Sequence, residues 1–337
     1  MSTLTSLQLP ERVRSTFLTT SRGQFAVLEA QPARGVSYRR PAVLIPGYTG
    51  SKENFLPILE PLAAAGRMVV AVDLRGQYQS PHAASRRGYA PSALAADVLA
   101  IADAVGADSG GVHLVGHSMG GLIAREAALQ NSARLLSLTL LGSGPGVIGG
   151  QRAAALRDVL TMLDPGDGAD TDDVNRLTAM VRQAWHEQHE PQARADGAHD
   201  HVIAFLKERM LRTCPVSLIV LAKYLLNCPD RTDDLARVVG AGLPAMVVYG
   251  ENDDAWPPPE QDLMATRLGA DRVCIPGAAH SPAIEAPVTT SSIFTTFWNG
   301  AERRQPTVHV CGRTRRAPVE SEPAAYATGN ESVAVTG

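Results

Sequence analysis

Short apolar runs alternate with longer segments of helical pattern in the first part of the chain. The runs are rich in Val, Leu or Ile, end at Gly, Pro or Asp, and lie at 42–45, 68–72, 112–115 and 135–141. Continuous apolar runs of this kind predict strands buried on both faces, as in a parallel sheet. Helical patterns lie between the runs, at 53–65, 91–105 and 119–130. The repetition predicts right-handed crossovers and an α/β fold with a doubly wound, mostly parallel sheet.

The alternation breaks near residue 145 and resumes near residue 241. The intervening segment is richer in charge and has helical patterns at 152–163, 171–188, 201–212 and 217–226. Beyond it the sheet pattern returns, with strands expected at 244–249 and 272–275 and helices at 260–268 and 287–298. We therefore expect a core formed by 20–144 and 241–300, with a helical cap insertion at 145–240 that roofs a pocket and sets specificity.

The last segment, 301–337, has no periodicity and is rich in Arg, Pro, Glu, Ser, Ala and Thr. That composition is typical of a disordered tail. It includes a loose basic cluster of Arg303, Arg304, Arg313, Arg315 and Arg316. We interpret the cluster as solvated, with contact to an acidic surface as the alternative.

Composition narrows the class of protein. The chain has 337 residues, of which 45% are hydrophobic and 19% charged, so it can bury a core. The net charge of −3 argues against a dedicated nucleic-acid binder. No apolar stretch approaches the ~20 residues of a membrane span, and the first twenty residues lack a signal-peptide block. The four cysteines are too sparse for a disulfide scaffold, so we expect buried thiols and a cytoplasmic location; the oligomeric state stays open.

The strongest chemical signal is the sequence GHSMG at 116–120. It fits the G-x-S-x-G nucleophile elbow, and it lies between a predicted strand and a predicted helix, where that motif is found. The glycines leave room for a sharp turn that lifts the hydroxyl of Ser118 clear of the sheet edge. The alternative is an ordinary strand-to-helix turn without chemistry.

Four further segments match one known family in the expected order. They are PGYTGS at 46–51, DLRGQYQS at 73–80, GEND at 250–253 and GAAH at 277–280. Together with the elbow they resemble the oxyanion loop, the D-x-R-G-x-G-x-S loop, the acid segment and the histidine loop of the α/β-hydrolase-fold superfamily. The resemblance covers roughly residues 20–300. Pro46 stands where the family more usually has His, and Tyr78 replaces the second Gly of its loop.

The resemblance implies a catalytic triad. A serine hydroxyl needs a base to become nucleophilic, and His280, which follows the last predicted strand, is the candidate base for Ser118. An acid must orient the imidazole. The resemblance favours Asp253, three residues after Gly250, and Asp254 remains the alternative. The order Ser118, Asp253, His280 is the one expected for this fold.

The oxyanion hole is expected to use backbone N–H groups from Met119 and Tyr48. Because these donors belong to the backbone, Pro46 should not abolish the hole. The phenol of Tyr48 is then free either to point into the acyl pocket or to pack.

Other polar residues have simpler interpretations. Asp73 and Arg75 are expected to fix their loop, and His117 to pack beside the elbow. The sequence from His186 to His189 suggests a metal motif, but H-E-x-x-H would need His where Glu190 stands. No nucleotide-binding glycine loop occurs, so we expect no cofactor and no metal.

The sequence therefore predicts a serine hydrolase that cleaves a carboxylic ester through an acyl-enzyme. Thioester hydrolysis, acyl transfer, carbon–carbon bond hydrolysis and cofactor-free peroxidation are alternatives on the same triad, and a non-catalytic binding protein is the alternative from another class. The expected partner is a small-molecule acyl substrate. Trp185, Phe205 and Tyr224 either line its pocket or pack in the core.

Overall fold

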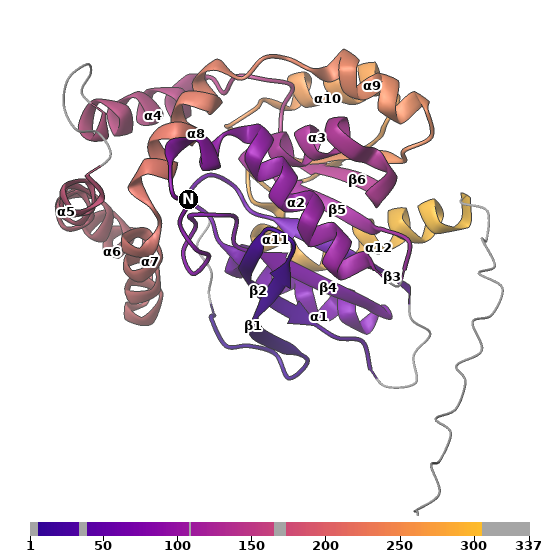
Figure 1. Cartoon of the computed structure of the whole chain (residues 1–337), viewed down its shortest axis with the longest axis horizontal. Coiled ribbons are helices and arrows are strands. Elements are labelled where there is room, and N and C mark those ends of the chain that lie inside the picture. Colours follow the sequence, from indigo (N-terminus) through magenta and orange to yellow (C-terminus); the bar gives the residue numbers. More distant parts are fainter. Residues whose placement is uncertain (1–5, 34–38, 108, 165–172, 305–337) are drawn as a thin grey trace, which may run out of the picture. The chain divides into compact units, whose positions relative to one another are not determined.

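The computed structural model describes residues 6–33, 39–107, 109–164 and 173–304. In this part of the chain eight strands form one sheet in the order β1-β2-β4-β3-β5-β6-β7-β8 (Figure 1). The strands are β1 (Val13–Thr20), β2 (Gly23–Ala30), β3 (Arg39–Ile45), β4 (Arg67–Val72), β5 (Val112–His117), β6 (Leu135–Leu141), β7 (Ala245–Gly250) and β8 (Asp271–Ile275). Pairing is parallel from β4 to β8 and antiparallel at β1, β2 and β4. The predicted α/β fold class is confirmed.

Helices cover both faces of the sheet, and side chains alternate between the two faces along each strand. On β3, Val43 and Ile45 pack in one core cluster, whereas Ala42 and Leu44 pack in the other. The first cluster contains side chains of α2 (Pro91–Gly106), α3 (Met119–Asn131), α9 (Thr232–Gly240) and α10 (Pro258–Leu268). The second contains those of the turn η1 (Lys52–Phe55), α1 (Leu56–Ala64), α11 (Pro282–Glu285) and α12 (Pro287–Arg304). Burial on both faces explains why the parallel strands read as continuous apolar runs.

The segment between β6 and β7 is helical, as expected. It holds α4 (Gly150–Leu163), α5 (Val174–Ala184), the wide turn η4 (Trp185–His189), α6 (Glu190–Ala195), α7 (Asp200–Arg212) and α8 (Pro215–Asn227). A small apolar core of its own includes Leu177, Val181 and Ile219. Residues 171–172 of the predicted helix lie outside the described residues. We call the segment 145–240 the helical insertion.

One helix of this segment packs differently from the prediction. Helix α9 lies at the end of the helical insertion, but it packs against α3 and α10, with Leu235 buried in the same cluster as the sheet. The predicted boundary at residue 240 therefore places one core helix with the insertion. Nothing in the periodicity distinguishes the two kinds of helix, because both bury one apolar face.

The sheet begins earlier than predicted. Strand β1 pairs along its whole length with β2, so the core starts at Val13 rather than at residue 20. It is an edge strand whose side chains are mostly exposed or half-buried, and Phe17 is 54% exposed. An edge strand needs no continuous apolar run, which is why its pattern is weak in the sequence.

The last helix ends later than predicted. Helix α12 continues to Arg304, so the tail expected from residue 301 does not begin there. Ala301 is fully buried, and Glu302 binds Arg67 and His113. Arg303 and Arg304 belong to the last turn of this helix. The remaining predicted tail, 305–337 with its other three arginines, lies outside the described residues.

Within the described ranges no single helix is long and apolar enough to cross a membrane. Helices α7 and α8 would meet the length and composition criteria only as a pair, and they are bent by 87° relative to each other.

Candidate active site

The predicted nucleophile elbow is present as a sharp turn between β5 and α3. Ser118 has φ 56° and ψ −124°, a strained combination for a residue with a side chain. Its neighbours explain the glycines of the motif. A Cβ on Gly116 would lie 2.2 Å from the carbonyl oxygen of Gly120, and one on Gly120 would lie 2.5 Å from that of Pro46. Only glycine lets the strand and the helix approach this closely.

Three of the predicted side chains lie within hydrogen-bond distance of one another in series, with His280 in the middle. Nε2 of His280 lies 2.9 Å from Oγ of Ser118, and Nδ1 of the same ring lies 2.9 Å from Oδ1 of Asp253. All three residues are buried, with exposed fractions of 8% for Ser118, 7% for His280 and 4% for Asp253. The carboxylate is positioned to hold the proton on Nδ1, which leaves Nε2 free to accept the serine proton.

The surroundings of Asp253 favour its ionised form. Burial opposes ionisation, but hydrogen bonds from His280, from the backbone N–H of Ala255 and from Nε2 of Gln261 outweigh it and hold the pKa of Asp253 below its usual range. Asp254, the alternative acid, is exposed and pairs with Arg152 at 2.6 Å. Of the two carboxylates, Asp253 is the one that contacts the imidazole.

The loop after β3 lies directly against the serine. A Cβ on Gly47 would lie 3.1 Å from Cβ and 3.4 Å from Oγ of Ser118, so the backbone of this loop approaches the serine side chain closely. Met119 is the first residue of α3, where backbone N–H groups have no partner within the helix. The predicted donors, the N–H groups of Tyr48 and Met119, thus belong to the two segments that flank Ser118.

The side chain of Tyr48 packs rather than standing free. Its hydroxyl donates to the carbonyl oxygen of Leu218 on α8 at 2.8 Å, and burial raises its pKa above the ordinary value. Of the two alternatives for this phenol, the structure has the packed one. The contact ties the loop after β3 to the helical insertion.

The loop after β4 holds the loop after β3 in place through side-chain hydrogen bonds. Nε2 of Gln77 donates to the carbonyl oxygen of Gly47 at 2.8 Å. The fully buried Lys52 donates through its backbone N–H and its ammonium to the two oxygens of Asp73, at 2.7 and 2.8 Å. Burial raises the pKa of Asp73 to about 6, although the ammonium of Lys52 opposes that rise. Asp73 therefore has the loop-fixing role expected for it.

The other two residues expected to be structural also contact protein groups. Arg75 pairs with the buried Asp97, at 2.7 and 3.0 Å, and donates to the carbonyl oxygen of Arg22. Nε2 of His117 lies 2.8 Å from the carbonyl oxygen of His280, and burial lowers the pKa of His117 to about 3. His117 is thus a neutral partner of the histidine loop.

Three supporting residues were not found from the sequence. Lys52, Gln77 and Gln261 are all fully buried polar side chains that hold loops of the site. A buried Lys or Gln reads as a surface residue in a sequence, because these types are rarely buried. The role of each of these side chains becomes clear only from the residue with which it forms a hydrogen bond in the folded protein.

The three aromatic candidates contact other protein groups. Trp185 is buried and donates to Glu190, Phe205 packs edge-on against Tyr78, and the hydroxyl of Tyr224 lies 3.4 Å from Nη2 of Arg125. Among the described residues, no group of three or more His, Cys, Asp or Glu side chains could hold a metal ion.

The cysteines are only partly as expected. Cys214 and Cys228 are buried, but Cys274 is exposed on β8, because that strand lies at the edge of the sheet. Cys311 lies outside the described residues.

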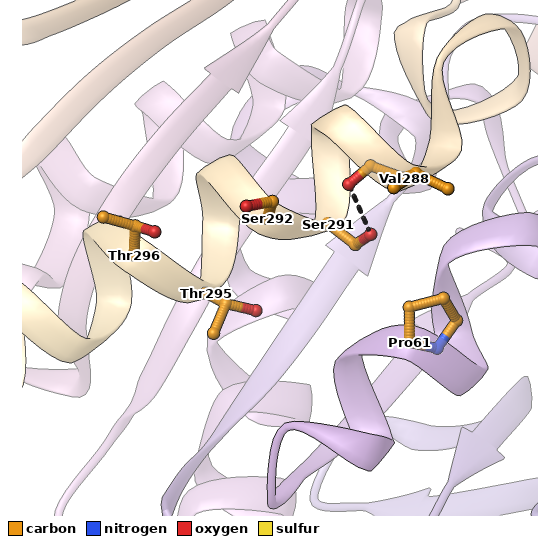
Figure 2. Close-up of a pocket in the computed structure, with 6 residues that line it drawn as sticks. All are labelled: Pro61, Val288, Ser291, Ser292, Thr295 and Thr296. Atoms are coloured by element: carbon orange, nitrogen blue, oxygen red, sulfur yellow. Dashed lines mark hydrogen bonds between the residues drawn. The ribbon is translucent and has the colours of Figure 1, made fainter.

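One pocket in the described structure is lined by none of the three residues of the predicted triad. Figure 2 shows it between α1 and α12, with a volume of about 230 Å³ and a hydroxyl-rich lining of Pro61, Val288, Ser291, Ser292, Thr295 and Thr296. None of these side chains titrates near neutral pH. A smaller cavity of about 10 Å³ adjoins the line of three residues and is lined by Asn54, Phe55, His117, Ser281, Ala283 and Ile284.

The chain belongs to the alpha/beta hydrolase family, whose model matches residues 42–291. This is the family that the resemblance in the sequence indicated.

The curated relatives are named for different reactions. The chain is 31% identical over 255 residues to the dihydrolipoyllysine-residue acetyltransferase component of the acetoin cleaving system of Pseudomonas putida, covering 73% of this chain and 60% of that protein. It is 40% identical over 102 residues to 2-hydroxy-6-oxononadienedioate/2-hydroxy-6-oxononatrienedioate hydrolase 1 of Dechloromonas aromatica, covering 30% of this chain and 34% of that protein. The matches span between 25% and 60% of the lengths of the four curated relatives.

Solved structures agree on the fold. A thermophilic esterase from Thermogutta terrifontis superposes with a TM-score of 0.61 at 21% identity, covering 86% of this chain and 99% of that chain. The enol-lactonase from Burkholderia xenovorans superposes with a TM-score of 0.60 at 19% identity, covering 84% and 100%. At these identities the likeness concerns the fold alone.

Proposed function

We propose that this protein is a serine hydrolase that cleaves a carboxylic ester through an acyl-enzyme. Ser118 is the nucleophile, His280 the general base and acid, and Asp253 the group that orients the imidazole. The observation that supports this most is the unbroken line from Asp253 through His280 to Ser118, with both distances at 2.9 Å. A strained serine at the end of a central strand gives the same indication.

The chemistry runs in two halves. As Oγ of Ser118 bonds to the ester carbonyl carbon, its proton passes to Nε2 of His280, and the carbonyl oxygen takes the negative charge. The backbone N–H groups of Tyr48 and Met119 stabilise that oxyanion, and each such donor is typically worth about 3 kcal/mol. His280 then protonates the leaving alcohol as the carbon–oxygen bond breaks.

Water completes the reaction. It attacks the acyl-enzyme while its proton passes to Nε2 of His280, and the proton then returns to Oγ of Ser118 as the acid is released. The helical insertion, which contacts the oxyanion loop through Tyr48 and Leu218, is proposed to roof the acyl pocket.

A fluorophosphonate probe tests the serine mechanism directly. Wild-type protein should be labelled at one residue, and Ser118→Ala should not be labelled, because the probe bonds only to an activated hydroxyl. Failure of the wild type to react would refute the proposal. The reacting bond is tested with p-nitrophenyl esters of rising acyl length beside a thioester and a vinylogous 1,5-diketone. Turnover of the diketone alone would replace ester cleavage by carbon–carbon bond hydrolysis.

A further inference from the structure

The carboxylate of Asp253 is held from two sides. Its Oδ1 faces Nδ1 of His280 and also accepts the backbone N–H of Ala255, both at 2.9 Å. Its other oxygen, Oδ2, accepts a hydrogen bond from Nε2 of Gln261 at 3.0 Å. Gln261 lies in the first turn of α10 and is fully buried. The second oxygen of the acid is therefore fixed by a residue eight positions further along the chain.

The chemistry of this contact fixes the orientation of the amide. The same nitrogen of Gln261 also donates to the carbonyl oxygen of Trp256 at 2.7 Å. Both neighbours are acceptors only, so the amide must present its NH₂ group to them. One side chain thus ties the carboxylate, the end of the acid loop and the start of α10 together.

Packing alone does not account for an amide at this position. Oε1 of Gln261 is buried and has no hydrogen-bond partner among the described residues. An unpaired buried acceptor costs free energy, whereas an apolar side chain of similar volume would carry no such cost. What the amide supplies and an apolar side chain could not is the donor shared by Oδ2 of Asp253 and the carbonyl oxygen of Trp256.

We propose that Gln261 is a positioning residue for catalysis, which locks the carboxylate of Asp253 in the rotamer that faces His280. With Oδ2 held, the carboxylate resists rotation about its Cβ–Cγ bond, and Oδ1 stays in line with Nδ1. This inference rests on the serine mechanism proposed above. Gln261 is proposed to align the base and not to bind substrate. Its loss should therefore lower kcat and leave KM nearly unchanged.

The test compares Gln261→Met with the matched variant Glu260→Met, which changes the neighbouring, exposed position of the same helix. Methionine has nearly the shape of glutamine but no donor. Misalignment of the base should lower kcat by about 10- to 100-fold and leave KM within about twofold. Methionine also leaves Oδ2 of Asp253 and the carbonyl oxygen of Trp256 without this donor, so the thermal midpoint should fall while KM is kept. Glu260→Met should leave all three quantities unchanged.

A double-mutant cycle separates positioning from general disruption. If Gln261 acts through Asp253, Gln261→Met in an Asp253→Asn background should cost less than about threefold, measured as the rate of fluorophosphonate labelling. An equal loss in both backgrounds would assign Gln261 a structural role and overturn the inference. A lowered thermal midpoint together with a raised KM would do the same.

The outcomes distinguish this inference from the proposed function. If wild type and Gln261→Met are labelled equally fast, Gln261 is not a positioning residue, and the serine mechanism stands. If the wild type is not labelled at all, the mechanism and the inference fall together. Should Gln261→Met not fold, Gln261→Asn carries the same kinetic expectation, because its amide ends one methylene short of Asp253.

Discussion

Two carboxylates that are adjacent in the sequence have different surroundings in the structure. Asp253 is 4% exposed and accepts hydrogen bonds from His280, Ala255 and Gln261. Asp254 is exposed and pairs with Arg152. A buried carboxylate with several donors stays ionised, and this one is in contact with the imidazole. At the scale of single residues, the position of each carboxylate decides which aspartate contacts the imidazole of His280.

Asp253→Asn should leave the fold intact and lower kcat by about 10³- to 10⁴-fold. The amide can still fill the space, but it no longer stabilises the imidazolium or selects the tautomer with its proton on Nδ1. The measurement is steady-state hydrolysis of the best p-nitrophenyl ester, with circular dichroism to check folding. Asp254→Asn is the control and should keep near-normal activity. The reverse ranking would transfer the acid role to Asp254.

At the scale of elements, the elbow depends on close approach of β5, α3 and the loop after β3. Gly116 and Gly120 face one another across the turn, and Gly120 also faces the carbonyl oxygens of Ile45 and Pro46. A side chain at either position would have to displace backbone atoms. The motif is therefore a packing requirement as much as a chemical one.

Gly120→Ala should lower the free energy of unfolding by about 3 kcal/mol and abolish most of the activity. Its Cβ would lie 2.5 Å from the carbonyl oxygen of Pro46 and 2.6 Å from that of Ile45, so the elbow and the oxyanion loop would move apart. Gly240→Ala in α9 is the matched control, because no heavy atom lies within 4 Å of its Cβ. We expect it to change stability by less than about 1 kcal/mol. Urea unfolding measures both, and equal effects would contradict the packing argument.

At the scale of the whole described molecule, a buried network ties the last helix to the sheet. His113 on β5 contacts Oγ of Ser137 at 2.7 Å and Oε1 of Glu302 at 3.0 Å, and its ring stacks on Trp298. Arg67 on β4 pairs with the same carboxylate. Burial opposes ionisation of Glu302, but the hydrogen bonds from His113 and Arg67 outweigh it and lower the pKa of Glu302 to about 2. The network joins β4, β5 and β6 to α12.

Stability should fall as the pH falls from about 6.5 to about 4. Burial lowers the pKa of His113 to about 4, so the folded protein holds this ring neutral while the unfolded chain protonates it near pH 6.5. The unfolded state then binds more protons, and the free energy of unfolding declines through that window, by on the order of 2 kcal/mol from this group. Above pH 6.5 the contribution is fully present.

Urea unfolding at several pH values measures this slope. His113→Asn should be less stable at pH 7, and its stability should depend less steeply on pH between about 6.5 and 4, with the contribution of His117 remaining. Parallel pH dependences for wild type and His113→Asn would show that His113 is not the titrating group.

A feature of this protein can be predicted from the sequence only where it leaves a local pattern among neighbouring residues. Strands buried on both faces give apolar runs, and the elbow, the acid segment and the histidine loop are contiguous motifs. The edge strand β1 gives no such run, and helix α9 has the same periodicity as its neighbours in the insertion. Their membership of the core depends on what they pack against, which lies elsewhere in the chain.

By itself the sequence determined the fold class, the helical insertion and the short list of candidate site residues, because local hydrophobicity and turn chemistry depend on neighbouring residues. Only the tertiary structure decided which aspartate contacts His280, where the phenol of Tyr48 points, and that Gln261 and Glu302 are held inside. Each of these depends on a partner brought close by the sheet and its crossovers. The energy of a buried polar group is set by that partner, and the sequence position of the group does not reveal it.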